Sequence, residues 1–476
     1  MAILSAKNAY SIWPSVVLAD TPVELTITPE TAIHLLVEGQ EYGIVIIPMN
    51  TDEPCHDTPV CPIRLTATAH GGVLRFTHTF AGEQEYLIRI MESPTSGREL
   101  SIYALEPDLY ALRPMKGELH SHSRRSDGGL DPAASHGLYR EYGYEFRALT
   151  DHHRYHPGRE IAAAYDGVKL GIALVQGEEI HAPDNELHIV NAGGAASVAA
   201  RYIIDEEGYR REVEEYLARV PEDIPEKYRY RYASSQWICD RIHEAGGLAI
   251  LAHPYWQPPN RTYQLCDELT RLLLCSGMFD ALELVNGSGV GVNRLVNLWS
   301  ELRAECGLRI PVVGSSDNHG YSMIQPTSQR RIGNLFTICF AEGASEKALC
   351  SAIREFRSVA VEATGEDWCR EYRCYGSLRL VSYAQYLLRW YYPRLQRLCQ
   401  AEGMAMRDYA IGDADKELVE RLVERSEQFR LRFFGQLPPP TIPDRVLEHE
   451  KKWGGITVKK WEPTLVGDKE MLFPLK

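Results

Sequence analysis

The chain has 476 residues, enough for roughly three ordinary domains or for one large domain with additions. Its composition, 44% hydrophobic and 24% charged, is typical of a globular protein and excludes an intrinsically disordered chain. A net charge of −14 argues against general binding to nucleic acids or anionic membranes, because both attract clustered cations. The expected partner is a small-molecule substrate, and an anionic one would have to meet a local group of basic residues.

The sequence also limits the cellular compartment. The first residues, MAILSAKNAY, lack the basic start and the long apolar run of a signal peptide, and no apolar stretch is long enough to cross a bilayer. The 11 cysteines include no CxxC pair, which indicates reduced thiols rather than a disulfide framework or a thiolate zinc site. We therefore expect a cytoplasmic protein, whose oligomeric state stays open.

Three regions follow one another along the chain. Residues 1–113 contain short β-rich runs, such as VELTITP and EYLIRIM, between turn residues, which predicts a β-sandwich accessory domain. From 114 to 364, short apolar strands alternate with helical stretches, the pattern of an α/β fold. A charged insertion at about 201–232 follows one strand and is expected to lie over the same face as the strand ends, like a lid. Residues 365–476 are expected to form a helical extension and a tail.

Two helical patterns stand out in this last region. Apolar residues at helical spacing from Tyr383 to Tyr391 predict one helix, which Pro393 should kink or end. The segment DKELVERLVERSEQFRLRFFG predicts another, which begins near Asp415 and stops at Gly435. The apolar stripe of the first helix is expected to pack against the α/β part.

Nearly every predicted strand of the α/β part ends near a histidine or a carboxylate. In the first strand, GELHSH, His120 and His122 alternate and therefore point to the same side. The later strands carry Asp151 and His152, Glu178 and Glu179, His188, His253, and Asp317 with His319. Taken singly, each could be a surface histidine, a helix cap or a buried core residue. Because strand ends converge in α/β folds, six strands with such residues near one end together predict a shared metal centre.

The ligand types indicate the chemistry of this centre. Histidine and carboxylate ligands without thiolates are typical of hydrolytic sites that hold two or more ions. Zinc, manganese and iron all suit such ligands, so the metal stays open. Alternation along the third strand leaves open whether Glu178 or Glu179 faces the centre.

The motifs resemble, in order over about residues 116–320, those of the PHP (polymerase and histidinol phosphatase) metallohydrolase superfamily. They are HxH followed by Ser126-Asp127-Gly128, TDH at 150–152, GxE at 177–179, His188, AHP at His253, and DxH at 317–319. Asp127 and the overall spacing resemble the branch with small PHP phosphodiesterases and the carbaryl-hydrolase type. The resemblance implies a distorted seven-stranded β/α barrel, with the β-sandwich before it and the helical extension after it.

The resemblance also implies two or three divalent metal ions and the residues that hold them. The GxE spacing of the family selects Glu179 over Glu178. The implied ligand sets are His120, His122, Glu179 and Asp317 for one ion, Glu179, His188 and His253 for a second, and Asp127, His152 and His319 for a third. His153, His156 and His181 match no motif position and are interpreted as groups behind the ligands or on the surface.

The expected activity is hydrolysis of a small phosphomonoester or phosphodiester by a metal-activated water. Asp127 or His319 is expected to protonate the leaving group or to orient the nucleophile. Arg124 and Arg125 are candidates to bind a phosphate, and a solvated loop pair is the alternative interpretation of both. A carboxyl-ester, carbamate or amide hydrolase with the same metals is the second candidate function. A binding protein with a vestigial metal site is the third.

Overall fold

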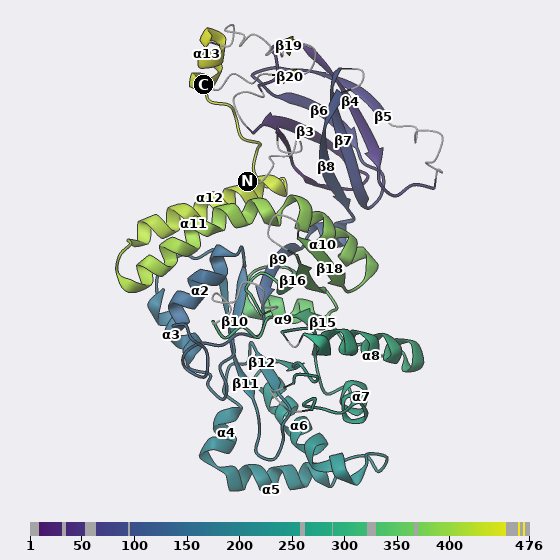
Figure 1. The fold of residues 1–476 in the computed structure, drawn as a ribbon, viewed down its shortest axis with the longest axis vertical. Helices are drawn as coiled ribbons and strands as arrows, with labels where there is room; N and C mark the ends of the chain where they lie inside the picture. Colours follow the sequence, from purple (N-terminus) through teal and green to yellow (C-terminus); the bar gives the residue numbers. More distant parts are fainter. Residues whose placement is uncertain are drawn as a thin grey trace. The chain divides into compact units, whose positions relative to one another are not determined.

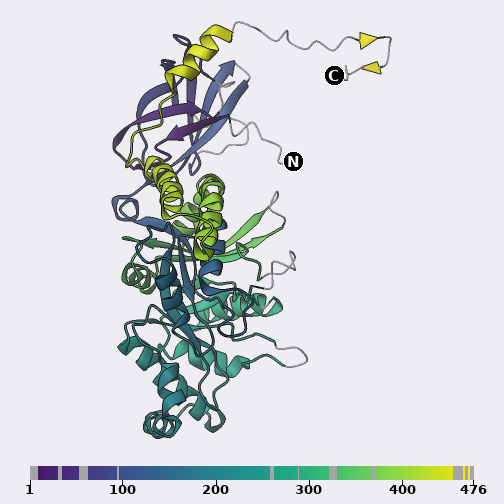
Figure 2. The same ribbon diagram turned by 90° about the vertical axis from the view of Figure 1, so that its left-hand side faces the viewer.

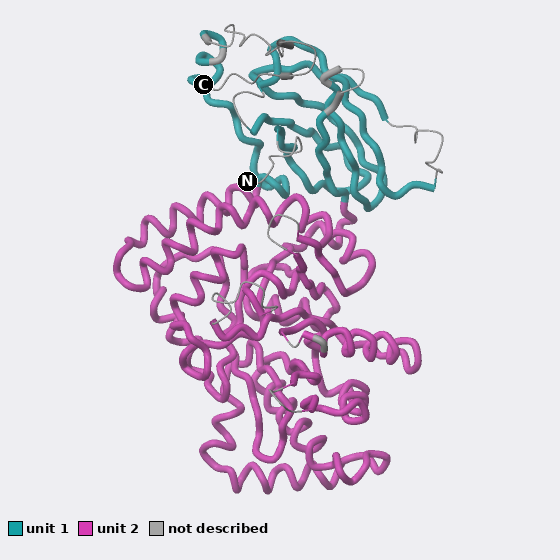
Figure 3. The backbone as a smooth tube through the Cα atoms, in the orientation of Figure 1, with its two compact units in different colours: residues 1–104, 432–476 teal, residues 105–431 magenta. Residues whose placement is uncertain are grey.

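The computed structural model describes residues 9–30, 35–52, 63–93, 96–257, 262–287, 289–320, 330–365, 370–453, 465–466 and 470–471. It divides into two compact units, unit 1 with residues 1–104 and 432–476, and unit 2 with residues 105–431 (Figure 3). The three regions expected from the sequence, with boundaries after residues 113 and 364, remain a prediction about domains. Each unit is described by itself.

Unit 1 is built from two antiparallel sheets around one apolar core. The first sheet contains, in spatial order, β1 (Tyr10–Trp13), β3 (Pro22–Pro29) and β6 (Leu74–Thr79). The second contains β2 (Val16–Leu18), β8 (Ser96–Leu105), β7 (Gln84–Ser93), β4 (Glu41–Pro48) and β5 (Ile63–Thr68). Ile27 of the first sheet and Ile44 and Ile88 of the second are fully buried in the same core. Short elements of the C-terminal segment, α13 (Asp444–Trp453), β19 (Leu465–Val466) and β20 (Glu470–Met471), complete this unit.

Unit 2 contains a single sheet of ten strands that is nearly closed. In spatial order these are β15 (Val312–Gly314), β14 (Ala281–Val285), β13 (Leu248–Leu251), β12 (Ile189–Ala192), β11 (Ala173–Ile180), β10 (Phe146–Leu149), β9 (Arg113–Glu118), β16 (Leu335–Ala341), β17 (Ser358–Thr364) and β18 (Glu371–Tyr375). β15 meets β16, because the Thr337 hydroxyl donates to the Gly314 carbonyl at 2.9 Å. The α/β class is confirmed. The expected seven-stranded barrel is not established, since β16, β17 and β18 continue the sheet beyond β9.

The strands of unit 2 do not all run in the same direction. β9, β10 and β11 are parallel, as are β13, β14 and β15. β12 is antiparallel to both of its neighbours, so its beginning lies beside their carboxyl ends. α1 (Pro107–Tyr110) precedes β9. Helices follow several strands of the sheet, namely α2 (Pro132–Glu141), α3 (Pro157–Ala164), α7 (Asp267–Cys275), α8 (Val290–Cys306) and α9 (Glu346–Arg354) (Figure 1).

The insertion after β12 is helical. It comprises α4 (Ala199–Ile204), α5 (Glu206–Leu217) and α6 (Glu226–Glu244), at the lower end of unit 2 in Figure 1. Tyr209 and Val213 of α5 and Trp237 of α6 are buried in the apolar core of this unit. The insertion is therefore a packed part of the fold.

Three helices close the other side of unit 2, namely α10 (Leu378–Trp390), α11 (Tyr392–Ile411) and α12 (Lys416–Phe433). Tyr383, Tyr386 and Leu387 are buried on α10, as their spacing predicts, and α10 ends just before Pro393. The sequence reading missed α11, which lies beside α12 in both views (Figures 1 and 2). It packs closely on α2, where a Cβ on Gly403 would stand 2.4 Å from the carbonyl oxygen of Gly137.

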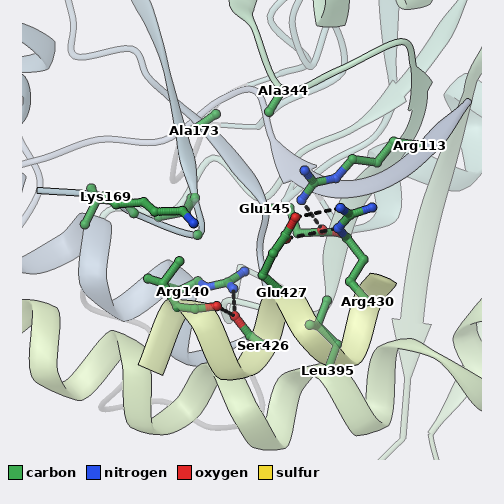
Figure 4. A pocket seen from close by; sticks show the side chains of 14 residues that line it. Arg113, Arg140, Glu145, Lys169, Ala173, Ala344, Leu395, Ser426, Glu427 and Arg430 are labelled. Carbon is green, nitrogen blue, oxygen red and sulfur yellow. Dashed lines mark hydrogen bonds and ion pairs between the residues drawn. The ribbon is translucent and has the colours of Figure 1, made fainter. Parts of the chain in front are cut away.

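A small cavity of about 180 Å³ lies at the amino ends of the unit 2 strands, next to α11 and α12 (Figure 4). Charged side chains surround it, and they are paired with one another. Arg140 donates from Nε and Nη2 to the two carboxylate oxygens of Glu402, both at 2.8 Å, and Arg113 contacts Glu145 at 3.0 Å. Arg140 and Glu402 are almost completely buried.

Within the ranges that the structure describes, no helix is long and apolar enough to cross a membrane.

Candidate metal centre

All nine residues predicted as metal ligands come together at one end of the strands of unit 2. His188 lies at the start of its strand rather than at the end, which fits because β12 runs antiparallel to its neighbours. The positions are His120 and His122 after β9, Asp127 in the loop beyond them, His152 after β10, Glu179 near the end of β11, His188 before β12, His253 after β13, and Asp317 with His319 after β15.

Backbone hydrogen bonds continue the sheet beyond the named strands and set the register of these ligands. The segments after β9 and β15 form a parallel bridge between Ser121 and Asn318, and the amide of Asp317 donates to the carbonyl of His120 at 3.1 Å. His253 and Asp317 have positive φ angles of 23° and 49°, a region that side chains other than glycine rarely adopt. Such strain is typical of functional residues that the surrounding fold holds in place.

The first group of ligand atoms is fully enclosed. Nε2 of His120 and Nε2 of His122 lie 3.3 and 3.4 Å from Oε2 of Glu179. Oδ1 of Asp317 is 3.0 Å from Nε2 of His122 and 3.5 Å from Nε2 of His120. All four side chains are at most 7% exposed. His120, His122 and Glu179 form one candidate metal group, and Asp317 lies beside both histidines and forms another with His120 and His253.

The second group shares Glu179 and uses its other oxygen. Oε1 of Glu179 is 2.7 Å from Nδ1 of His188 and 3.2 Å from Nε2 of His253. Because the two oxygens of a single carboxylate face two different groups of donors, Glu179 can bridge two ions. Bridging carboxylates of this kind are typical of two-metal hydrolytic sites.

The third group is the most open. Oδ2 of Asp127 lies 3.2 Å from Nε2 of His319 and 3.5 Å from Nε2 of His152. The Asp127 side chain is 55% exposed, whereas His152 and His319 are mostly buried. His122 closes this group from the inner side, so the third group adjoins the first.

Unpartnered buried atoms test whether these residues suit metal ions. In the described part of the chain, Oε2 of Glu179, Nδ1 of His152 and Nδ1 of His188 are buried and have no aligned hydrogen-bond partner. They nevertheless approach opposite partners closely, with 2.8 Å between His152 Nδ1 and Glu179 Oε2. Buried polar atoms are normally hydrogen-bonded, so atoms gathered in this way suit cations that would bind their lone pairs.

The electrostatics of the cluster reflect the crowding of these groups. Burial opposes ionisation of Glu179, but neighbouring imidazoles, above all His120, hold the pKa of its carboxyl well below the usual range. Burial also opposes protonation of His152, yet contacts with the carboxylates of Asp127 and Glu179 raise its pKa to about 10. Burial lowers the pKa of His188 to about 3, which leaves this ring neutral and able to bind a cation.

Further carboxylates hold the ligands from behind. Oε2 of Glu283 lies 2.9 Å from Nδ1 of His120, so that Nε2 of this ring points into the centre. Glu118 accepts a hydrogen bond of 2.6 Å from the hydroxyl of Ser316, which ties the end of β9 to the segment that carries Asp317. The contact of Glu283 with His120 therefore helps to orient a candidate ligand.

Asp151 organises the loop that carries Asp127. Its carboxylate accepts hydrogen bonds from the amide and the hydroxyl of Ser123, both at 2.7 Å, and from the hydroxyl of Ser126 at 2.6 Å. Asp151 is completely buried. The aspartate of the TDH motif therefore shapes the loop, while His152 next to it reaches the cluster.

The two adjacent glutamates of β11 point to opposite sides of the sheet. Glu179 lies in the cluster, whereas Glu178 accepts hydrogen bonds from the hydroxyl of Ser197 and the amide of Val198 at the start of α4. The structure thus places Glu179 among the ligand atoms, as the GxE spacing implies.

Two further residues lie near the centre, namely His181, interpreted from the sequence as a group behind the ligands or on the surface, and Arg330, which no motif indicates. His181 lies two positions after Glu179 on the same face, and its Nε2 is 3.7 Å from Glu179 Oε2. Strand alternation was the signal that would have found it. Arg330 places Nη2 3.1 Å from Oδ2 of Asp317, and no spacing in the sequence indicates that contact. His153 and His156 remain outside the cluster, beside Tyr202 and Glu160 respectively.

The structure directs Arg124 and Arg125, predicted to bind substrate, toward nearby carboxylates. Arg124 pairs with Asp131 at 2.9 Å, and Arg125 contacts Glu160 at 2.7 Å. Asp131 caps α2 and Glu160 lies on α3, so both arginines hold the helices that follow the loop. The solvated-loop alternative describes these contacts better than a phosphate clamp.

No protein-family model matches the chain, and no curated protein matches it either. Similar solved structures include a two-domain protein from Bacteroides vulgatus described as containing a PHP-like metal-dependent phosphoesterase, at 20% identity and a TM-score of 0.35. That match covers 53% of this chain and 66% of the other, less than two thirds of its length.

Two further structures cover 43% of this chain at 19% identity. One is described as a metal-dependent phosphoesterase from Bifidobacterium adolescentis, with a TM-score of 0.31 and 88% of that chain covered. The other is an amidohydrolase from Chromobacterium violaceum with bound sulfate, with a TM-score of 0.28 and 87% covered. The description of the Bacteroides structure names a PHP-like phosphoesterase, and PHP is the superfamily whose motifs the sequence resembles.

Proposed function

We propose that this protein is a metal-dependent phosphoesterase of the PHP type that hydrolyses a small phosphomonoester or phosphodiester. The observation that carries the proposal is the shared carboxylate of Glu179, which faces His120 and His122 with one oxygen and His188 and His253 with the other. Divalent cations bound there supply a water of lowered pKa and positive charge that stabilises a developing oxyanion.

The chain's own residues would move the proton. Asp127 and His319 lie 3.2 Å apart at the open side of the centre, where a substrate enters. Burial lowers the pKa of His319, but contact with the Asp127 carboxylate outweighs it and raises this pKa above the usual range. Where no ion occupies the third group, this imidazole could give a proton to a leaving-group oxygen, while Asp127 keeps the ring oriented.

A cation beside the cluster supports an anionic substrate. Arg330 contacts Asp317 through Nη2 and lies 3.4 Å from Nδ1 of His319 through Nη1. A guanidinium at this place can help to bind phosphoryl oxygens. Arg330 takes the role that the sequence assigned to Arg124 and Arg125.

The test combines metal analysis with a substrate panel. Purified protein is analysed for zinc, manganese and iron, and then assayed with nitrophenyl phosphate, bis-nitrophenyl phosphate, naphthyl acetate and naphthyl methylcarbamate. We expect bound metal and turnover of one or both phosphoesters. Turnover of the carboxyl substrates alone would instead establish the carboxyl-ester or carbamate hydrolase. Protein that binds no metal under any loading condition would contradict both enzymes and favour a binding protein.

Matched variants separate the metal site from general damage. His122→Ala should abolish activity in protein that remains folded by circular dichroism. His243 lies on α6, outside the cluster, where it contacts Asp280 at 2.9 Å, so His243→Ala is the control and should retain activity.

A further inference from the structure

A groove of unit 2 adjoins the candidate metal centre at His152. It has a volume of about 790 Å³ and is bounded by the segment from His152 to Arg159 and by residues 195–204, which include α4. His152 belongs both to the wall of this groove and to the third group of ligand atoms. A molecule whose reacting group sits at the metal centre would therefore extend into this groove.

One wall of the groove is cationic. Arg154 and Arg159 are exposed on it, and within the described residues neither guanidinium has a carboxylate partner. The described residues that line the groove include three histidines and no aspartate or glutamate. In a chain with a net charge of −14, a lining of this kind marks a place where a negative charge can bind.

The opposite wall is apolar. Ile203 and Ile204 on α4 are 61% and 84% exposed, beside Ala196 and Ala200. Two neighbouring isoleucines at such exposure next to a catalytic centre form a surface on which an apolar part of a ligand can lie.

The position of the apolar wall is fixed by the metal-binding strand. Glu178 accepts hydrogen bonds from the amides of Val198 and Ala199, which start α4. Nδ1 of His153 lies 2.7 Å from the hydroxyl of Tyr202, which joins α4 to the cationic wall. The two walls are therefore held at a set distance from each other and from Glu179.

We propose that the groove binds the leaving group of the substrate, and that the substrate is a phosphoester with a flat apolar body and a second anionic group. This proposal rests on the proposed phosphoesterase activity. The apolar body lies against Ile203 and Ile204, and the second anion faces Arg154 and Arg159. The phosphoryl group at the metal centre is the one that is hydrolysed.

The test uses metal-loaded protein and a series of aryl phosphates. The series runs from phenyl phosphate to naphthyl phosphate and then to naphthyl phosphate with a sulfonate on the remote ring. The sulfonated compound is used as two positional isomers. We expect kcat/KM to rise along this series. The sulfonate of the better isomer should add about 1.5-fold to fivefold, the effect of a solvent-exposed charge contact. Released phosphate is the readout.

Variants assign this preference to the two walls. Arg154→Gln and Arg159→Gln should lower the ratio of sulfonated to plain naphthyl phosphate toward one, and Ile204→Ser should lower the ratio of naphthyl to phenyl phosphate. Arg201 is also an exposed arginine on α4, but it pairs with Glu244 and does not line the groove. Arg201→Gln is the matched control, and both ratios should stay as in the unaltered protein.

The outcomes distinguish the two proposals. If phenyl phosphate is hydrolysed and neither sulfonate raises kcat/KM, the groove proposal is overturned and the phosphoesterase proposal stands. The same conclusion follows if the sulfonate still raises kcat/KM in the protein that combines Arg154→Gln with Arg159→Gln. If no phosphoester is hydrolysed, the phosphoesterase fails, and calorimetric binding of the sulfonated naphthol decides on the groove. Weaker binding to the double variant then supports the anion site, and equal binding overturns it.

Discussion

Buried charged side chains have different partners at the two ends of the unit 2 strands. At the amino ends, Arg140 and Glu402 form a two-point ion pair that a hydrogen bond from Ser426 completes. Figure 4 shows Arg140 beside Ser426. At the carboxyl ends, Glu179 is surrounded by imidazoles, and its Oε2 has no aligned hydrogen-bond donor among the described residues. The first arrangement is complete with protein atoms alone, whereas the second gathers atoms that suit cations as further partners.

This contrast separates structural from functional charge. A buried ion pair must satisfy both partners within the protein, because an uncompensated buried charge costs several kcal/mol. Buried polar atoms that lack a hydrogen-bond partner within the protein are explained where a ligand or an ion can bind them. Each of the following experiments alters residues at one end of the strands and compares the result with a change made elsewhere in the protein.

The largest effect is expected from Glu179→Gln. This change keeps the size of the side chain but removes the charge shared by the first two groups, so both ions should be lost. We expect kcat/KM for nitrophenyl phosphate to fall by at least about a thousandfold, with metal content falling in parallel by elemental analysis. Glu178→Gln, on the other face of the same strand, should keep its metal. Activity close to normal in Glu179→Gln would show that the ligand set is wrong.

At the opposite end, Arg140→Met should leave the metal in place and weaken the fold. Glu402 would stay buried without its partner, and we expect the free energy of unfolding to fall by about 3–5 kcal/mol in urea denaturation. Replacing Glu402 by Leu in the same chain removes the orphaned charge and should recover most of this loss. A loss of metal without a loss of stability would show that the two ends are not separate in function.

A smaller effect is expected from the carboxylate behind the metal ligands. Glu283→Gln weakens the contact that orients His120, and the affinity for metal should fall about 10-fold to 100-fold in competition with a chelator. Glu362 is a buried carboxylate of the same sheet that pairs with Arg373 away from the cluster, so Glu362→Gln should retain full affinity. Equal affinities of both variants would remove Glu283 from the site.

Metal affinity should also depend on pH, with the smallest change over any single pH unit. Contacts with the Asp127 and Glu179 carboxylates outweigh burial and raise the pKa of His152 to about 10, so its ring is protonated at neutral pH before metal binds. A metal that uses this ring must displace the proton, and affinity should rise with pH by up to about tenfold per pH unit until the pH reaches that pKa. Titrations at about pH 6, 7 and 8 measure this slope. An affinity that is the same at each pH would exclude His152 from the ligands.

Much of the site could be predicted from the sequence because its residues follow strand ends. His120 and His122 share one face by alternation, and the carboxyl ends of neighbouring strands meet at one edge, so separate motifs had to converge. The helix at Leu378–Trp390 was predictable for a similar reason, since Tyr383, Tyr386 and Leu387 repeat at helical spacing.

What could not be predicted depends on the direction of single side chains and on distant contacts. Arg124 and Arg125 stand next to the ligands in sequence, but only the packing of α2 and α3 decides that Asp131 and Glu160 bind them. Arg330 reaches Asp317 from a segment with no recognisable spacing. α11 was not predicted as a separate helix. It packs on α2 through the close approach of Gly403 to Gly137, and a contact between segments so far apart leaves no local pattern in the sequence.

The adjacent glutamates of β11 have a consequence for how the chain tolerates change. Glu179 serves the centre and Glu178 holds the first turn of α4, from opposite faces of one strand. Moving the strand by one residue would exchange the two faces. A one-residue deletion between β10 and Glu178 that shifted this register would therefore damage the metal centre and the groove together. We therefore expect insertions and deletions to be tolerated only outside β11, where they leave the positions of Glu178 and Glu179 unchanged.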